Sequence, residues 1–200
     1  MELEEIKNKL TKYQYDYFAE LKEHIDLPIY FYGSISREDY VKNKSDLDVE
    51  VFTNNIKATK IKIEHLFNYY QIKNENRFIA FDFNNKPISG YKYFFKDEIR
   101  GLQFDFIIFN KSCEDILLHQ HKIIETQLPF LCSVFLIVMK FLYYNLNIIN
   151  KETMVYIKRQ FWQLYAPYKS AYKIMDETEY IHYYNSQKEK EYLIKPKNIM

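Results

Sequence analysis

YFYGSISREDYVKNKSDLDVEVF, residues 30–52, is the stretch that decides how this 200-residue chain folds. Three aromatic residues lead into Gly33-Ser34, and a polar linker then leads into the alternating run DLDVEV at 46–51. Side chains alternate between the two faces of a strand, so the three acids share one face and Leu47, Val49 and Val51 share the other. The stretch therefore predicts an extended segment over 29–32, a tight turn, and a strand over 46–52 with one acidic face.

The acidic face of the second strand predicts a metal site. Asp46 and Asp48 are spaced about 7 Å apart along one face of a strand, and hard divalent cations prefer oxygen ligands. The turn at Gly33-Ser34 suits a phosphate, because glycine allows close approach to backbone N–H groups and serine adds a hydroxyl.

This order of elements resembles the nucleotidyltransferase superfamily to which DNA polymerase beta belongs. The family pattern is a hydrophobic strand, Gly-Ser, a short linker, Asp-hydrophobic-Asp, and a third Asp on a later strand. The resemblance covers residues 28 to 110. It implies an α+β fold, with a nucleotidyltransferase-like mixed β-sheet and flanking helices in a catalytic domain over 1–111. An all-α helical domain over 112–200 would follow and close the cleft.

The third carboxylate is expected at Asp105. It stands in QFDFI, residues 103–107, where it is a charge inside an otherwise apolar strand and therefore needs a partner or a metal. Asp82, in Phe81-Asp82-Phe83, is the reserve candidate, but it precedes a turn at Asn84, which favours a solvated side chain.

The resemblance also implies a site, a cofactor and a reaction. Asp46, Asp48 and Asp105 would be the catalytic residues and would bind two Mg²⁺ ions, with Mn²⁺ as the alternative. Gly33, Ser34 and Lys44 would contact the phosphates of a nucleoside triphosphate, with ATP as the first choice. The expected reaction is in-line attack of an acceptor hydroxyl on the α-phosphorus with release of pyrophosphate.

Spaced acids also occur in other kinds of site. In a calcium loop starting at Asp46 the sixth position is Val51, where glycine is required, so that interpretation fails. A sugar-nucleotide transferase would need a longer nucleotide-binding domain. A catalytically silent protein of the same fold, with a binding or regulatory role of the antitoxin type, remains the alternative function.

Composition limits the partners. The chain has 28 basic and 27 acidic residues, so no strong basic field indicates a long nucleic acid as acceptor. A small molecule or a protein is the first expectation for the acceptor, with an RNA 3′ end as the alternative. The two cysteines fit no metal or disulfide spacing, which favours a reducing, cytoplasmic location. The apolar run at 130–139 ends at Lys140, too soon to cross a membrane.

The remaining elements are predicted from periodicity and turn signals. A hairpin is expected from strands at 78–83 and 91–95, followed by a strand at 102–109. Helices are expected at 2–25, 57–71, 113–126, 129–147, 151–165 and 168–184.

Overall fold

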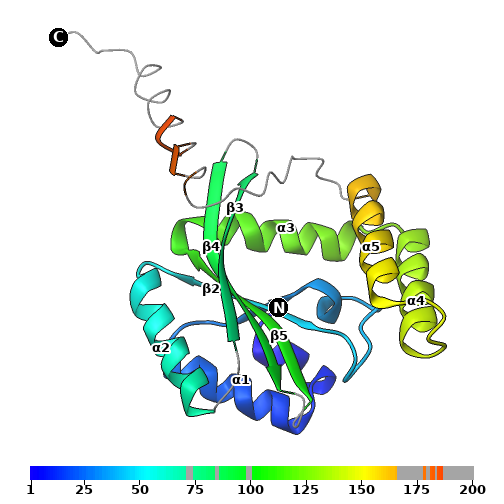
Figure 1. The fold of residues 1–200 in the computed structure, drawn as a ribbon, viewed down its shortest axis with the longest axis horizontal. Helices are drawn as coiled ribbons and strands as arrows, with labels where there is room; N and C mark the ends of the chain where they lie inside the picture. Colours follow the sequence, from blue (N-terminus) through cyan, green and yellow to red (C-terminus); the bar gives the residue numbers. More distant parts are fainter. Residues whose placement is uncertain are drawn as a thin grey trace.

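The computed structural model describes residues 1–70, 74–83, 86–97 and 101–165, with residues 178, 181, 182 and 184–186. Most of the helix expected at 168–184 lies outside the described residues. The fold is α+β: a five-stranded mixed sheet with helices on both faces (Figure 1). The strands are β1 (Tyr30–Tyr32), β2 (Leu47–Thr53), β3 (Asn74–Phe83), β4 (Lys86–Asp97) and β5 (Leu102–Asn110). The helices are α1 (Lys12–Ile25), α2 (Ile56–Tyr69), α3 (Glu114–Gln127), α4 (Phe130–Tyr144) and α5 (Lys151–Tyr165), with short 3-10 turns at Leu3–Lys9, Gly33–Ser36 and Lys111–Cys113.

The strand order is β1-β2-β5-β4-β3. Strands β2 and β5 run parallel at the centre, and every other neighbouring pair is antiparallel. The hairpin predicted from 78–83 and 91–95 is confirmed as β3 and β4, although both strands are longer than expected. Because β2 and β5 are parallel neighbours, the first residues of the two strands lie side by side, although they are far apart in the sequence.

The predicted N-terminal helix is divided in two. A 3-10 turn over Leu3–Lys9 precedes α1, and the expectation of one helix over 2–25 was wrong at this point. Thr11 provides the physical reason: its hydroxyl accepts from the Gln14 backbone N–H, while the Gln14 side chain accepts from the Thr11 N–H. This reciprocal capping box starts a new helix.

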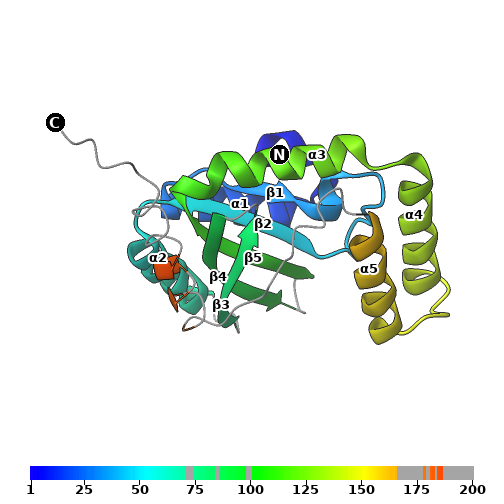
Figure 2. The same cartoon turned by 90° about the horizontal axis from the view of Figure 1, so that it is seen from above.

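The alternation in β2 divides the core between the two faces of the sheet. Leu47, Val49 and Val51 pack with α1 and α2 in the larger hydrophobic cluster. On the other face, Phe52 packs with Phe109 and with Leu117 of α3. Figure 2 shows α3 lying along the sheet, with α4 and α5 standing together beyond one end of it. The domain boundary expected at residue 111 stays a prediction, and α3, which follows it, packs onto the sheet.

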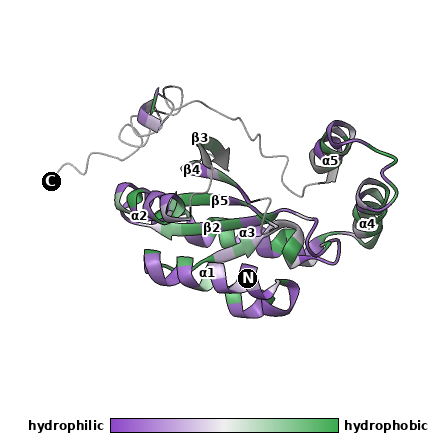
Figure 3. Cartoon of the chain, turned by 60° about the horizontal axis from the view of Figure 1, so that its bottom comes forward, coloured by the Kyte–Doolittle hydropathy of each residue, from purple (hydrophilic) through white to green (hydrophobic). Residues whose placement is uncertain are grey.

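Helix α4 is apolar around most of its circumference, as its colouring in Figure 3 shows. Its exposed large side chains are Phe130, Leu131, Val134, Phe135, Ile137, Val138 and Phe141. Within the described part of the chain, no single helix is long and apolar enough to span a membrane. The bent pair Lys111–Gln127 and Phe130–Tyr144, which meet at 90°, satisfies length and composition only when taken together.

Phe104 gives a direct test of the core. Its ring is fully buried and stacks on Phe95 at 4.4 Å between centroids, with Phe18 at 5.1 Å. We expect Phe104→Ala to lower the free energy of unfolding by about 3–5 kcal/mol in urea titrations, because it leaves a cavity between sheet and helix. Ile61→Ala, at an exposed site on α2, is the control and should change it by less than about 0.5 kcal/mol. Equal losses in both variants would contradict this account of the core.

Candidate functional site

Three acids from two strands meet at one end of the sheet. In the parallel pairing of β2 with β5, Asp48 lies directly opposite Asp105, so both side chains are on the same face. Asp46 immediately precedes β2, and its Oδ1 accepts a hydrogen bond of 2.6 Å from Gln103 of β5. The structure therefore brings together the three carboxylates that the sequence singled out. The side chain of the reserve candidate, Asp82, lies outside the described residues.

The Gly33-Ser34 turn lies against this group of acids. Gly33 has a φ of +75°, in the left-handed region, and a Cβ added to it would lie 2.1 Å from Oδ2 of Asp48. Only glycine has both the backbone freedom and the room for this position. The Gly33 carbonyl accepts from Ser36 Oγ at 2.9 Å and from Arg37 Nη1 at 2.8 Å. Ser34 is buried, and its carbonyl accepts from the Arg37 N–H.

A buried ionic network holds this turn in place. Arg37 donates from Nε and Nη2 to the two carboxylate oxygens of Asp39, at 2.7 and 3.1 Å. Lys140 of α4 lies 3.0 Å from Asp39 Oδ2 and donates to Ser45 Oγ at 3.2 Å. The Asp39 side chain is 2% exposed, so one carboxylate joins the Gly33 turn, the loop before Asp46 and helix α4.

Burial and the neighbouring charges shift the pKa values of Asp39 and Lys140. Burial alone would raise the pKa of Asp39, but the hydrogen bonds and positive charges of Arg37 and Lys140 hold it below its ordinary value. Burial lowers the pKa of Lys140, and the carboxylate of Asp39 opposes that effect. Sequence reasoning missed Asp39, whose carboxylate pairs with both Arg37 and Lys140.

Lys44 lies at the end of α4. Its ammonium donates to the Tyr144 carbonyl and to Asn145 Oδ1, both at 3.0 Å, where a cation satisfies the free carbonyl end of a helix. Its expected contact with a nucleotide stays a prediction, and such a contact would require Lys44 to give up these two hydrogen bonds.

Glu50, the third acid of the alternation, is separate from the other two. Its carboxylate is buried beneath α3, where Nε2 of His121 lies 2.9 Å from Oε1. The His121 ring stacks on Tyr32 at 4.4 Å. The acidic face of β2 is therefore divided: Glu50 fixes α3 to the sheet through His121, and Asp46 and Asp48 have other partners.

Burial, together with the nearby charge of Asp105, raises the pKa values of the two acids of the pair. Loss of solvent around the carboxyl raises the pKa of Asp48 to about 6, and the charge of Asp105 adds to the rise, while Lys158 acts against it. The pKa of Asp46 is raised for the same two reasons, opposed by Lys158 and Lys151. Both lysines belong to α5, which stands next to this end of the sheet in Figure 2. Helix α5 therefore faces the acids with positive charge.

Two of the acids already have partners on the sheet. Lys92 of β4 forms an ion pair with Oδ2 of Asp105, and Gln103 holds Asp46. In the part of the chain that the structure describes, no group of three His, Cys, Asp or Glu side chains is arranged to hold a metal ion. The donors themselves suit Mg²⁺ or Mn²⁺, since three carboxylates on adjacent strands offer only oxygen ligands. Binding such an ion would require Asp105 to exchange Lys92 for it.

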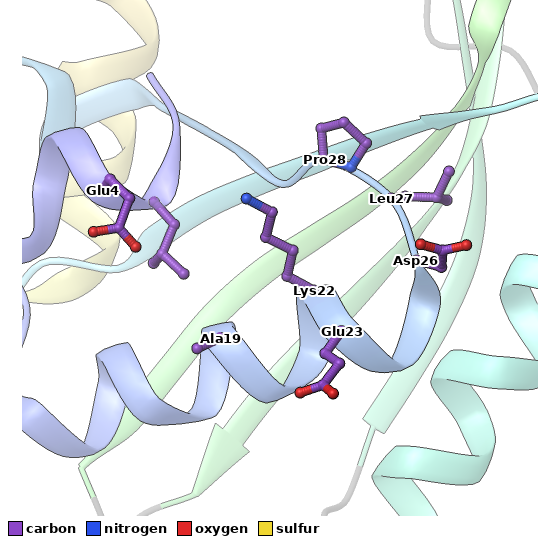
Figure 4. Close-up of a pocket in the computed structure, with 8 residues that line it drawn as sticks. Glu4, Ala19, Lys22, Glu23, Asp26, Leu27 and Pro28 are labelled. Carbon is purple, nitrogen blue, oxygen red and sulfur yellow. The ribbon is translucent and has the colours of Figure 1, made fainter.

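Two surface hollows lie elsewhere on the described part of the chain. A pocket of about 440 Å³ is bordered by α1 and the 26–28 turn, and in Figure 4 Lys22 extends into the space between Glu4 and Pro28. A larger hollow of about 840 Å³ adjoins the outer side of the ionic network and includes Ser36 and Arg37 in its lining. Neither is lined by Asp46, Asp48 or Asp105. No protein-family model, curated protein or solved structure matches this chain.

We expect Asp39→Asn to destabilise the protein by about 3–5 kcal/mol, because it removes the carboxylate that the buried cations Arg37 and Lys140 share. Chemical denaturation measures this loss. The matched control is Glu38→Gln, which removes a neighbouring but exposed acid and should cost less than about 0.5 kcal/mol. Similar values for the two variants would show that the network contributes nothing to stability.

The raised pKa of Asp48 predicts a pH-dependent gain from Asp48→Asn. The unfolded carboxyl ionises near pH 4 and the folded one near pH 6, so ionisation favours the unfolded state across that interval. The stability advantage of the variant should be absent below pH 4, grow up to about pH 6, and then stay constant at ~1–3 kcal/mol. Urea titrations of both proteins across this range measure it, and a difference independent of pH would contradict the prediction.

Proposed function

We propose that the chain is a metal-dependent nucleotidyltransferase of the DNA polymerase beta superfamily, which moves a nucleoside monophosphate from a nucleoside triphosphate to an acceptor hydroxyl. The observation that carries the proposal is the register of β2 and β5, which sets Asp105 beside Asp48, with Asp46 next to them and the Gly33 backbone against Asp48. We further propose that α4 and α5 belong to the helical part that closes the cleft over these acids.

Each residue has a role in this proposal. Asp46, Asp48 and Asp105 would hold two Mg²⁺ ions, or Mn²⁺, which when bound supply positive charge to the phosphates and to the entering and leaving oxygens. The backbone at Gly33 and Ser34 would hold the distal phosphates of the triphosphate, with ATP as the first choice. Lys158 and Lys151 of α5, whose charges already act on Asp46, would contact the same phosphates from the other side.

The proposed chemistry is one in-line displacement. The acceptor oxygen forms a bond to the α-phosphorus, and the bond from that phosphorus to the bridging oxygen breaks, so that pyrophosphate leaves. Asp105 orients the acceptor hydroxyl and takes its proton, either directly or through water. Lys92, released from Asp105, would remain next to the reacting group as a source of positive charge.

A catalytically silent protein of the same fold is the second candidate. The observation that favours it is the pairing of Asp105 with Lys92, which gives that carboxylate a cation without any metal. In such a protein the acids and their partners would stabilise the fold, and a binding or regulatory role would not depend on Mg²⁺.

The two candidates are separated by a label-transfer experiment. The purified protein is incubated with Mg²⁺, each of the four α-phosphate-labelled ribonucleotides, and separate pools of RNA, extract protein and small metabolites. We expect label to appear in one pool with wild type and to fall at least ~100-fold with the double variant Asp46→Asn, Asp48→Asn, which removes the proposed metal ligands.

Asp16→Asn, which removes an exposed acid of α1, is the control and should transfer label like wild type. Absence of transfer with every nucleotide, together with nucleotide binding that does not respond to Mg²⁺, would favour the silent protein.

A further inference from the structure

The half of the sheet next to Asp105 is not covered by α3. That helix packs on the far half of the face, over Phe52, Ile107 and Phe109. Asp105 and Lys92 retain about one fifth of their side-chain surface, at 20% and 21%, and Phe94 is 37% exposed. A partly exposed, partly polar sheet surface therefore continues from Asp105 onto β4.

The strand register determines which side chains share this surface. Phe94 of β4 is directly opposite Asp105, and Lys92 is the next residue on the same face of β4. Arg77 of β3 is directly opposite Lys92. Cross-strand partners have Cβ atoms roughly 5 Å apart, so the aromatic ring, the two cations and the carboxylate form one continuous group.

Two features of this group are suited to a ligand. Arg77 and Lys92 lie directly opposite each other, and since Lys92 is paired with Asp105, the group keeps an excess of one positive charge. Phe94 exposes an aromatic ring, while its neighbours on the other face of β4, Tyr93 and Phe95, are fully buried. An anionic ligand would offset the first feature, and a planar ring stacked on Phe94 would cover the second.

We propose that this surface binds the acceptor, and that the acceptor is a nucleotide group, with its base on Phe94 and its phosphate on Arg77. Base–aromatic stacking combined with cations that follow the phosphates is the usual way in which proteins hold single-stranded nucleic acid. A ligand held there carries its sugar hydroxyls toward Asp105, directly opposite Phe94. The surface thus selects the RNA 3′ end or a free nucleotide over a protein acceptor. The role of this surface in catalysis rests on the proposed function, whereas the binding site itself rests on the strand register of β3, β4 and β5.

The test is direct binding without divalent cations, so that it does not depend on catalysis. Fluorescence anisotropy with a short single-stranded RNA labelled at its 5′ end measures affinity, and AMP is used as competitor. Phe94→Ala and Arg77→Ala should each weaken binding roughly 5- to 100-fold, and Phe94→Tyr, which keeps a ring, should restore it to within about threefold of wild type.

Matched controls exist on α2. Tyr69→Ala removes an aromatic residue that is 74% exposed, and Lys57→Ala removes an exposed cation, and neither should alter binding. Competition by AMP at the affinity of RNA would identify a single nucleotide as the ligand, whereas RNA binding that AMP does not displace would identify a strand. Both results support the site.

Failure of wild type to bind either probe, or equal binding by Phe94→Ala, Arg77→Ala and wild type, would overturn the inference. The proposed function is judged separately. If label is transferred to protein and Phe94→Ala does not change the transfer, the proposed transferase function stands and this acceptor site is wrong. If binding depends on Phe94 but no label is transferred, the binding site stands and the proposed transferase function is wrong.

Discussion

The parallel pairing of β2 with β5 is the constraint on which the rest of this structure depends. It sets Asp48 and Asp105 beside each other on one face, with Asp46 next to them. Like charges so close together oppose the ionisation of these acids. Three neighbouring residues counter this effect: Lys92 pairs with Asp105, Gln103 donates to Asp46, and the positive charge of Lys158 acts on both Asp46 and Asp48. The sheet thus collects negative charge at one end, and the elements around that end are positioned to balance it.

A second set of buried charges joins the site to the helical part of the chain. Arg37, Asp39 and Lys140 come from the turn, the loop and α4, and each is nearly inaccessible to solvent. Buried ion pairs often add little to stability relative to apolar packing, but they are costly when one partner is missing. Their consequence here is geometric. Since Asp39 binds the residue that also holds the Gly33 carbonyl, α4 cannot move from the sheet without disturbing the turn.

Much of the fold could be predicted from the sequence because its signals were local. The alternation at 46–51 predicted the strand, its acidic face and its buried face, and the turn residues around Asn84 predicted the hairpin. Asp105 could be singled out because it is a lone charge in an apolar strand. The partners of these acids could not be predicted, because Lys92, Gln103 and Lys158 reach them through strand order and helix placement. Asp39 was missed for the same reason: its burial depends on α4, about a hundred residues later in the chain. The start of α1 was marked locally by Thr11 and Gln14, but the apolar periodicity over residues 2–25 obscured that signal.

Gly33 also has a consequence for anyone who wishes to engineer this chain. Replacing glycine by alanine stabilises many proteins, because it narrows the conformations open to the unfolded chain. The chain has three glycines, and at Gly33 an added methyl group would collide with Asp48. Gly90 would meet the Ile108 carbonyl at 2.5 Å, and Gly101 has a φ of +64°. This route to greater thermal stability is therefore closed, and designers must turn instead to proline in loops or to the surface of the helices.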